Sequence, residues 1–191
     1  MPKDQAYLKA EKKIQQALKS GATDLNLGNM KLTKLPDSLG QLTQLTKLNL
    51  ENNQLIVLPA SLEQLVQLEA LYIYNNKLNT LPVYLGQLTK LEHLYLDNPI
   101  KEVPSWIKNL INLQNLALGD SELTILPEWI SELKNLSVLY LQNNKLVDIP
   151  PSLAQLEHLT KLNLRGNPLN PALQSAYDQG LDAVKAYLRS L

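Results

Sequence analysis

A set of leucines that recurs about every 23 residues constrains this chain more than any other feature. Residues 45–65 read LTKLNLENNQLIVLPASLEQL, and the same apolar positions return each time the frame is moved along the chain. Six full copies and a partial seventh occupy residues 22–169. Because one copy is too short to bury its own leucines, neighbouring copies must stack and share a single core.

Each copy contains two kinds of apolar spacing. The L-x-L segment near its start alternates with the period of a β-strand, so its two leucines point inward and the residue between them points outward. After the proline, leucines recur at i and i+3, which predicts a short helical or extended turn on the outer side. The asparagine that follows the strand is expected to point inward and to bond backbone groups of the turn.

This frame resembles the leucine-rich-repeat pattern L-x-x-L-x-L-x-x-N-x-L, here extended by L-P-x-x-L-x-x-L. The resemblance implies an α/β solenoid shaped as a curved, right-handed horseshoe, with about seven short parallel strands lining its concave face. It also implies a protein–protein interaction scaffold without catalytic activity, of the kind found in signalling assemblies.

Two copies depart from the pattern in the loop that follows the strand. The fourth copy is one residue short at residues 96–100, beside Pro99, and the fifth has Ser121 where most copies have asparagine. We therefore expect the row of inward asparagines to be broken or shifted here. Two interpretations remain open, namely sequence drift that the solenoid tolerates and a local kink that shapes the binding face.

The two ends of the chain are predicted to cap the repeats, since a solenoid must cover its terminal leucines. Residues 1–21 contain an amphipathic helix that Gly21 ends. Residues 170–191 form a second cap, a helix for which Asn170 is the N-cap and Pro171 the first helical residue, although Gly180 weakens its middle. The alternative is that one of these helices is free to bind a partner.

The flanking segments also resemble the borders of the repeat region in bacterial Roco-type proteins. The segments concerned are residues 17–27, 166–171 and 186–191. In that family the repeats precede a Ras-like GTPase module, so the resemblance implies an alternative role as the regulatory arm of a multidomain GTPase. The chain itself has no G-x-x-x-x-G-K-[ST] phosphate loop.

Composition argues against several classes of function. Eighteen basic residues balance 18 acidic ones, so no net charge attracts nucleic acid or anionic lipid. With no cysteine and two histidines, the chain predicts no metal site and no cofactor. No apolar run approaches the roughly 18 residues of a membrane-spanning helix, and no secretory signal is evident. We expect a cytoplasmic protein that is monomeric in isolation.

The strand frame predicts which side chains face the concave side. The residue between the two leucines of each L-x-L should form one continuous row, because adjacent strands lie roughly 4.8 Å apart. From the first copy to the last, this row consists of Asn26, Asn49, Tyr72, Tyr95, Ala117, Tyr140 and Asn163.

Tyrosines gather in the middle of this face, and a gap of small residues at Ala117 and Gly119 separates them from Tyr140. Tyrosine offers a large apolar area with a polar tip and is frequent at interface hot spots. Charged and amide residues at both ends, Lys47 and Lys161 among them, would form a polar rim. The candidate partner-binding residues are Glu51, Tyr72, Tyr74, His93, Tyr95, Asp97, Tyr140, Gln142 and Arg165.

Two alternatives to protein binding stay open for these residues. The tyrosines could simply stabilise neighbouring strands, or the gap could hold a small molecule or a glycan. Catalysis is not expected, although His93 and Asp97 form a possible acid–base pair, because neither a nucleophile nor a set of metal ligands accompanies them.

Overall fold

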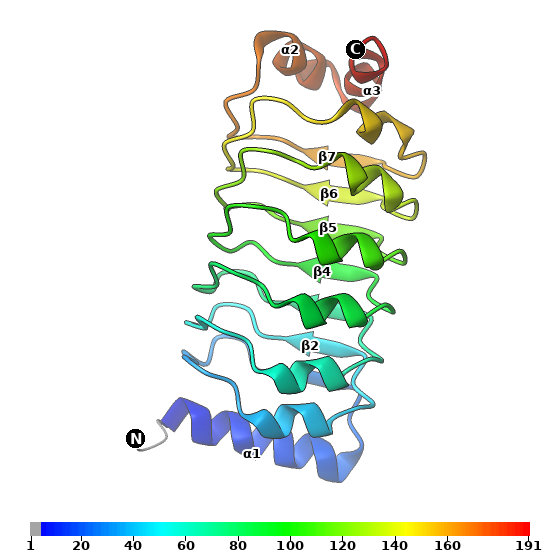
Figure 1. Cartoon of the computed structure of the whole chain (residues 1–191). Helices are drawn as coiled ribbons and strands as arrows, with labels where there is room; N and C mark the ends of the chain where they lie inside the picture. Colours follow the sequence, from blue (N-terminus) through cyan, green and yellow to red (C-terminus); the bar gives the residue numbers. More distant parts are fainter. Residues whose placement is uncertain (1–4) are drawn as a thin grey trace.

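The computed structural model describes residues 5–191, which form one continuous stack of repeats (Figure 1). Seven strands pair in parallel in the order of the sequence, so each copy contacts the copies next to it. This arrangement confirms the expected solenoid. The strands are β1 (Asp24–Asn26), β2 (Lys47–Asn49), β3 (Ala70–Tyr72), β4 (His93–Tyr95), β5 (Asn115–Ala117), β6 (Val138–Tyr140) and β7 (Lys161–Asn163).

On the opposite side of each repeat, the segment after the proline is a short 3₁₀ helix. The proline stands before the first helical residue, as Pro59 does with a φ of −72°, and the apolar i, i+3 spacing turns inward. The expected outer turn is thus confirmed as helical. These helices are η1 (Asp37–Gln41), η2 (Ala60–Gln64), η3 (Val83–Gln87), η4 (Ser105–Asn109), η5 (Glu128–Glu132) and η6 (Pro151–Gln155).

A row of buried asparagines, the asparagine ladder, holds the turns after the strands. Asn76 is representative: its Nδ2 donates to the carbonyls of Leu50 and Ile73 at 3.0 and 2.8 Å, while its Oδ1 accepts the backbone N–H of Leu55 at 3.0 Å. One amide therefore bonds backbone groups of two successive repeats, as the sequence pattern predicted. Such bonds offset the cost of burying polar groups away from water.

The irregular copies shift the ladder once and interrupt it once. In the shortened fourth copy Asn98, one position early, bonds the carbonyl of Ile73 at 2.9 Å and accepts the N–H of Leu78 at 3.3 Å. In the fifth copy the Ser121 hydroxyl donates to the carbonyl of Asn98 at 2.5 Å, but it does not accept a backbone N–H of the preceding repeat as the asparagines do. The N–H of Ile100 bonds the Asn98 carbonyl instead, at 2.6 Å.

The N-terminal cap is helix α1 (Gln5–Ser20), which covers the first repeat (Figure 1). Its inner face buries Ala10, Ile14 and Ala17. Gly21 ends the helix with a φ of +64°, a conformation that glycine adopts without strain. The amphipathic pattern therefore located this cap correctly.

The C-terminal cap is two helices, so the prediction of a single helix was wrong. Helix α2 (Pro171–Gln179) begins as expected, because the Asn170 side chain accepts the N–H groups of its first turn at 2.9 Å. Gly180, with a φ of +107°, then ends α2 and separates it from α3 (Leu181–Arg189). Both helices cover the last repeat, and Lys185 of α3 donates to the carbonyls of Leu156 and Leu159.

Candidate binding site on the exposed face of the sheet

The residues predicted to face outward form the row that the sequence implied. Parallel pairing places Asn49 beside Tyr72, Tyr72 beside Tyr95, Tyr95 beside Ala117, and Ala117 beside Tyr140. The leucine before each of these residues packs into the core. We call the exposed side of the sheet the concave face, and its central row the tyrosine row.

Aromatic and cationic groups contact one another along this row. The rings of Tyr72 and Tyr95 stack with centroids 5.1 Å apart and an interplanar angle of 25°. The ammonium group of Lys47 lies 5.4 Å from the Tyr72 ring centroid, and that of Lys161 lies 5.0 Å from the Tyr140 centroid. A hydrogen bond with Tyr140 raises the pKa of Lys161. Stacking thus holds the rings of Tyr72 and Tyr95 side by side, and cation–π attraction places a lysine against Tyr72 and against Tyr140.

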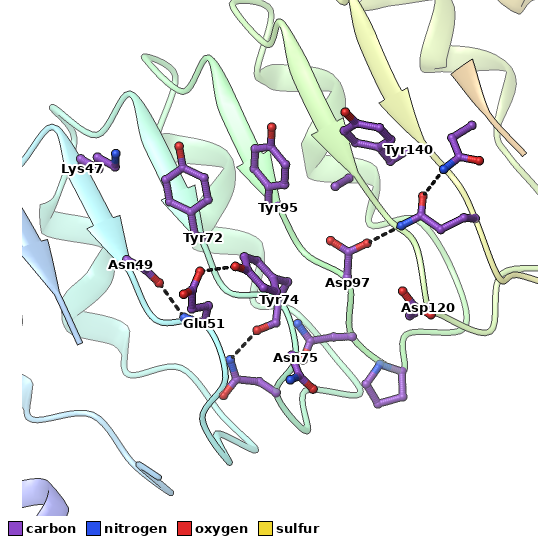
Figure 2. A pocket seen from close by; sticks show the side chains of 16 residues that line it. Lys47, Asn49, Glu51, Tyr72, Tyr74, Asn75, Tyr95, Asp97, Asp120 and Tyr140 are labelled. Carbon is purple, nitrogen blue, oxygen red and sulfur yellow. Dashed lines mark hydrogen bonds between the residues drawn. The ribbon is translucent and has the colours of Figure 1, made fainter. Parts of the chain in front are cut away.

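A hollow of about 850 Å³ opens over β2 to β7 on this face (Figure 2). Seven of the nine candidate residues line it, whereas His93 and Arg165 do not. His93 and Asp97, which the sequence suggested as a possible acid–base pair, are not joined by a hydrogen bond, and only Asp97 lines the hollow. The candidate residues that line the hollow are Glu51, Tyr72, Tyr74, Tyr95, Asp97, Tyr140 and Gln142.

One wall of the hollow is fixed by a hydrogen bond between Tyr74 and Glu51. The Tyr74 hydroxyl donates to the Glu51 carboxylate, as Figure 2 shows. This hydrogen bond, together with burial, raises the pKa of Tyr74 to about 12. The phenol therefore stays protonated at neutral pH and keeps the carboxylate in place.

Asp97 is a partly buried carboxylate without a cationic partner. Burial raises the pKa of Asp97 to about 6, the Asp120 charge adds to this shift, and the backbone N–H groups of Asp97 and Gly119 oppose it. Within the described part of the chain the one ion pair joins Lys145 to Glu122, on the exposed surface. Asp97 therefore carries its charge at neutral pH at an energetic cost.

Gly119 leaves the space through which Gln142 reaches Asp97. The Nε2 of Gln142, in the repeat of β6, donates weakly to Oδ1 of Asp97 at 3.5 Å, and Asn163 donates to Oε1 of Gln142 at 3.4 Å. A Cβ atom at Gly119 would lie 2.0 Å from Nε2 of Gln142 and 2.7 Å from Oδ1 of Asp97. Any other residue at this position would thus displace the amide from the carboxylate.

Sequence reasoning missed the loop residues that line the edge of the hollow. Asn75 and Asp120 both have positive φ angles, 55° and 47°, and both line it. They belong to a second row, which the shortened fourth copy interrupts and in which Asn75 donates to Asn52 at 2.6 Å. The signal was present as the residue before the ladder position, asparagine in Asn75-Asn76 and aspartate in Asp120-Ser121, since both tolerate this conformation. The other lining residues outside the nine candidates are Lys47, Asn49, Asn76, Asn98, Pro99, Ala117 and Asn163.

Two further structural features concern metal ions and membranes. No group of three or more histidine, cysteine, aspartate or glutamate side chains is placed to hold a metal ion among residues 5–191. In the same range, no helix has the length and apolar character needed to span a membrane.

Comparison with known proteins gives the same architecture. A family model described as a leucine-rich repeat region matches residues 24–116, and another described as leucine rich repeat matches residues 111–169. No curated protein matches the chain.

Solved structures resemble the chain over most of its length. A leucine-rich-repeat protein from Leptospira interrogans is 32% identical, with a TM-score of 0.71, over 84% of this chain and 47% of that one. The Arabidopsis receptor kinase HAESA, in complex with the peptide hormone IDA and the co-receptor SERK1, is 25% identical, with a TM-score of 0.70, over 81% of this chain and 28% of that one.

A third similar structure is the ectodomain of the plant membrane receptor kinase GASSHO1/SCHENGEN3 from Arabidopsis thaliana, in complex with CASPARIAN STRIP INTEGRITY FACTOR 2. It is 33% identical, with a TM-score of 0.64, over 72% of this chain and 17% of that one. The chain thus spans less than half the length of each of these three proteins. The two family models together match residues 24–169, well over half of the chain, which is therefore a member of the leucine-rich-repeat family.

Proposed function

We propose that this protein is a non-catalytic scaffold that binds a protein or peptide partner in the hollow of its concave face. The observation that carries the proposal is the tyrosine row, in which Tyr72, Tyr95 and Tyr140 line one open hollow of about 850 Å³. Tyrosine side chains bury much apolar area on binding while their hydroxyls keep a polar partner. Leucine-rich repeats are protein-interaction folds, so the proposal agrees with the family.

The hollow is already formed in the free chain, and this favours binding. Tyr72 and Tyr95 are held by stacking, Tyr74 by Glu51, and Gln142 by Asn163. A partner would therefore have to order few side chains, which lowers the entropic cost of association. Polar groups such as Lys47 and Asn49 surround the rings, as expected of an interface with an apolar centre and a polar rim.

Two of the similar structures supply further support. The HAESA and GASSHO1/SCHENGEN3 structures are complexes, in the first case with a peptide hormone. We extend only the general mode to this chain, namely capture of a polypeptide by a preformed repeat surface. We propose that the protein is located in the cytoplasm. Disulfides are rare in this reducing compartment, and a chain without cysteine does not use them. We also propose that the scaffold acts as a monomer within a signalling assembly.

Affinity capture from host lysate tests this function. The bait is the wild-type chain, and the test variant carries Tyr72→Ala and Tyr95→Ala, which remove the stacked pair but leave the core intact. A matched control carries Val83→Ala and Ile125→Ala, which remove apolar side chains that are 77% and 72% exposed away from the hollow. We expect a partner that the wild type and the control retain and the tyrosine variant loses. Capture of the same proteins by all three baits would refute the proposal.

The volume of the hollow favours a second candidate, a small-molecule or glycan ligand, since such sites typically measure 300–1,000 Å³. A thermal-shift screen of the wild type against the tyrosine variant tests it, because a true ligand would raise the Tm of the wild type alone. The prediction of a Roco-type regulatory arm has no structural observation in its favour and is decided by the gene sequence that follows Leu191.

A further inference from the structure

One step of the tyrosine row is empty. Along the row from β2 to β7, the Lys47 ammonium lies 5.4 Å from the Tyr72 ring centroid, and the centroids of Tyr72 and Tyr95 lie 5.1 Å apart. At the far end, the Lys161 ammonium lies 5.0 Å from the Tyr140 centroid. Each contact joins a ring to another ring or to a cation about 5 Å away. Between Tyr95 and Tyr140, by contrast, no ring or cation contact is found among the described residues. We call this space the slot.

The slot exists because β5 places Ala117 where its neighbours have tyrosine. Register sets Tyr95, Ala117 and Tyr140 in line across three strands, so the two tyrosines stand about 9.6 Å apart at the backbone. A flat group halfway between their rings would lie roughly 5 Å from each, which is within the range of about 6 Å for cation–π attraction. Ala117 is only 2% exposed and forms the floor.

Asp97 stands at one end of the slot. Figure 2 shows its carboxylate below the space between the Tyr95 and Tyr140 rings, on the side away from their hydroxyls. Gln142 reaches it from the β6 repeat at 3.5 Å. Lys161 hydrogen-bonds with Tyr140 at the opposite end of that ring and also interacts electrostatically with Tyr95, so this cation lies at the outer end of the slot, away from Asp97. The slot thus has two aromatic walls, a small apolar floor and, at its inner end, a carboxylate that accepts hydrogen bonds but has no cationic partner.

We propose that the slot between Tyr95 and Tyr140 receives an arginine side chain of the partner, whose guanidinium pairs with the Asp97 carboxylate. This inference rests on the proposed function and names the side chain that anchors the partner. The guanidinium would take the empty place in a row whose rings already contact a lysine at each end, and it would supply the cation that Asp97 lacks within the chain.

Arginine fits this slot better than the other candidate groups do. A guanidinium is flat, stacks on aromatic faces, sheds water more readily than an ammonium and offers a fork of donors to a carboxylate. Lysine offers a compact and strongly hydrated charge that gains little from two parallel walls. An inserted aromatic ring would fill the space but would leave the partly buried charge of Asp97 without a cationic partner.

The test uses three peptides and the full chain, observed by NMR. The probe is acetyl-Gly-Gly-Arg-Gly-Gly-amide, and the same peptide with citrulline or lysine in place of arginine serves as comparison. Citrulline keeps the flat shape but has no charge. We expect the arginine peptide to bind with a Kd of roughly 1 mM, as a single anchor does, and at least tenfold more tightly than the other two. Its largest shift changes should fall on the Ala117 methyl and the Gly119 amide.

Three variants locate the effect. Asp97→Asn should remove the preference for arginine over citrulline, because it removes the charge but keeps the shape. Ala117→Tyr should fill the slot with a further ring and abolish binding, whereas Asn26→Tyr adds a tyrosine at the β1 end of the row and should bind like the wild type. Should Ala117→Tyr fail to fold, Asp97→Asn still decides the question.

The outcomes separate this inference from the proposed function. Equal binding of the arginine and citrulline peptides, no binding of the arginine peptide up to about 10 mM, or shift changes away from Ala117 would each overturn the arginine slot. In that case the lysate experiment would still show whether Tyr72 and Tyr95 bind a protein partner. If the tyrosine variant also retained every captured protein, the concave face would be excluded as the binding surface.

Discussion

The two faces of the same seven strands differ in how much they vary from repeat to repeat. The middle residue of every strand is leucine, and six of these seven leucines are buried. The residue beside it, on the concave face, is asparagine, tyrosine or alanine. Packing explains the first face, because every leucine fills the same space between stacked copies. The second face meets no such demand, so it is free to carry the residues that recognise a partner.

Two adjacent residues of β3 test this contrast most strongly. Leu71 is fully buried, and we expect Leu71→Ala to lower the free energy of unfolding by roughly 2–5 kcal/mol, since it leaves a cavity in the shared core. Tyr72→Ala, one residue away on the concave face, should cost less than about 1.5 kcal/mol, the value of an aromatic pair. Urea unfolding of both variants measures the difference. Equal losses would show that the concave face is as structural as the core.

The same comparison applies to the loops that follow β3 and β5. Asn76→Ala removes an amide that bonds backbone groups of two repeats, and we expect a loss of roughly 2–4 kcal/mol because those groups stay buried without partners. Ser121→Ala, at the equivalent position of the irregular copy, removes only one hydroxyl donor, which lies near the carbonyls of Asn98 and Gly119, and should cost about 1 kcal/mol. Thermal unfolding provides the measurement. A larger loss at Ser121 would mean that the irregular copy is held as tightly as the regular ones.

Asp97, unlike Leu71 and Asn76, should make the folded state less stable at neutral pH. Its carboxyl is neutral in both states below pH 3.8, the ordinary value, but between 3.8 and about 6 the unfolded chain releases its proton first. The folded state therefore loses stability as the pH rises through this range, and the loss is complete above about 6. Asp97→Asn avoids this loss, so we expect it to be about 1–3 kcal/mol more stable than the wild type at pH 7.5.

Urea unfolding at pH 4 and pH 7.5 checks this prediction. The advantage of Asp97→Asn over the wild type should be small at the lower pH and larger at the higher one. Asp24→Asn, on the exposed surface of β1, controls for the loss of one negative charge. A difference between Asp97→Asn and the wild type that does not change with pH would contradict the assigned cost of burial. A confirmed cost would mean that stability is given up at the residue proposed to bind arginine.

Much of the fold and part of the site could be predicted, and the boundary between the two has a physical basis. Strands, outer turns, asparagines and the N-terminal cap follow from local spacing, so the repeat was sufficient to place them. Two predictions depended on geometry that the repeat spacing does not specify. His93 and Arg165 were assigned to the site because they face outward, yet the hollow excludes both. The C-terminal cap was expected as one helix, but Gly180 adopts a φ of +107° that no helix contains.

The sequence by itself therefore determined the solenoid, the register of its strands and the row in which Tyr72, Tyr95, Ala117 and Tyr140 follow one another. Those features arise from a period, and a period repeats its geometry in every copy. Only the tertiary structure decided how side chains from different repeats meet: Gln142 reaching Asp97 across Gly119, Tyr74 bonding Glu51, and Asn98 taking over one position early. Such contacts depend on rotamers and on the space that neighbouring residues leave, which the spacing of residues along the chain does not specify.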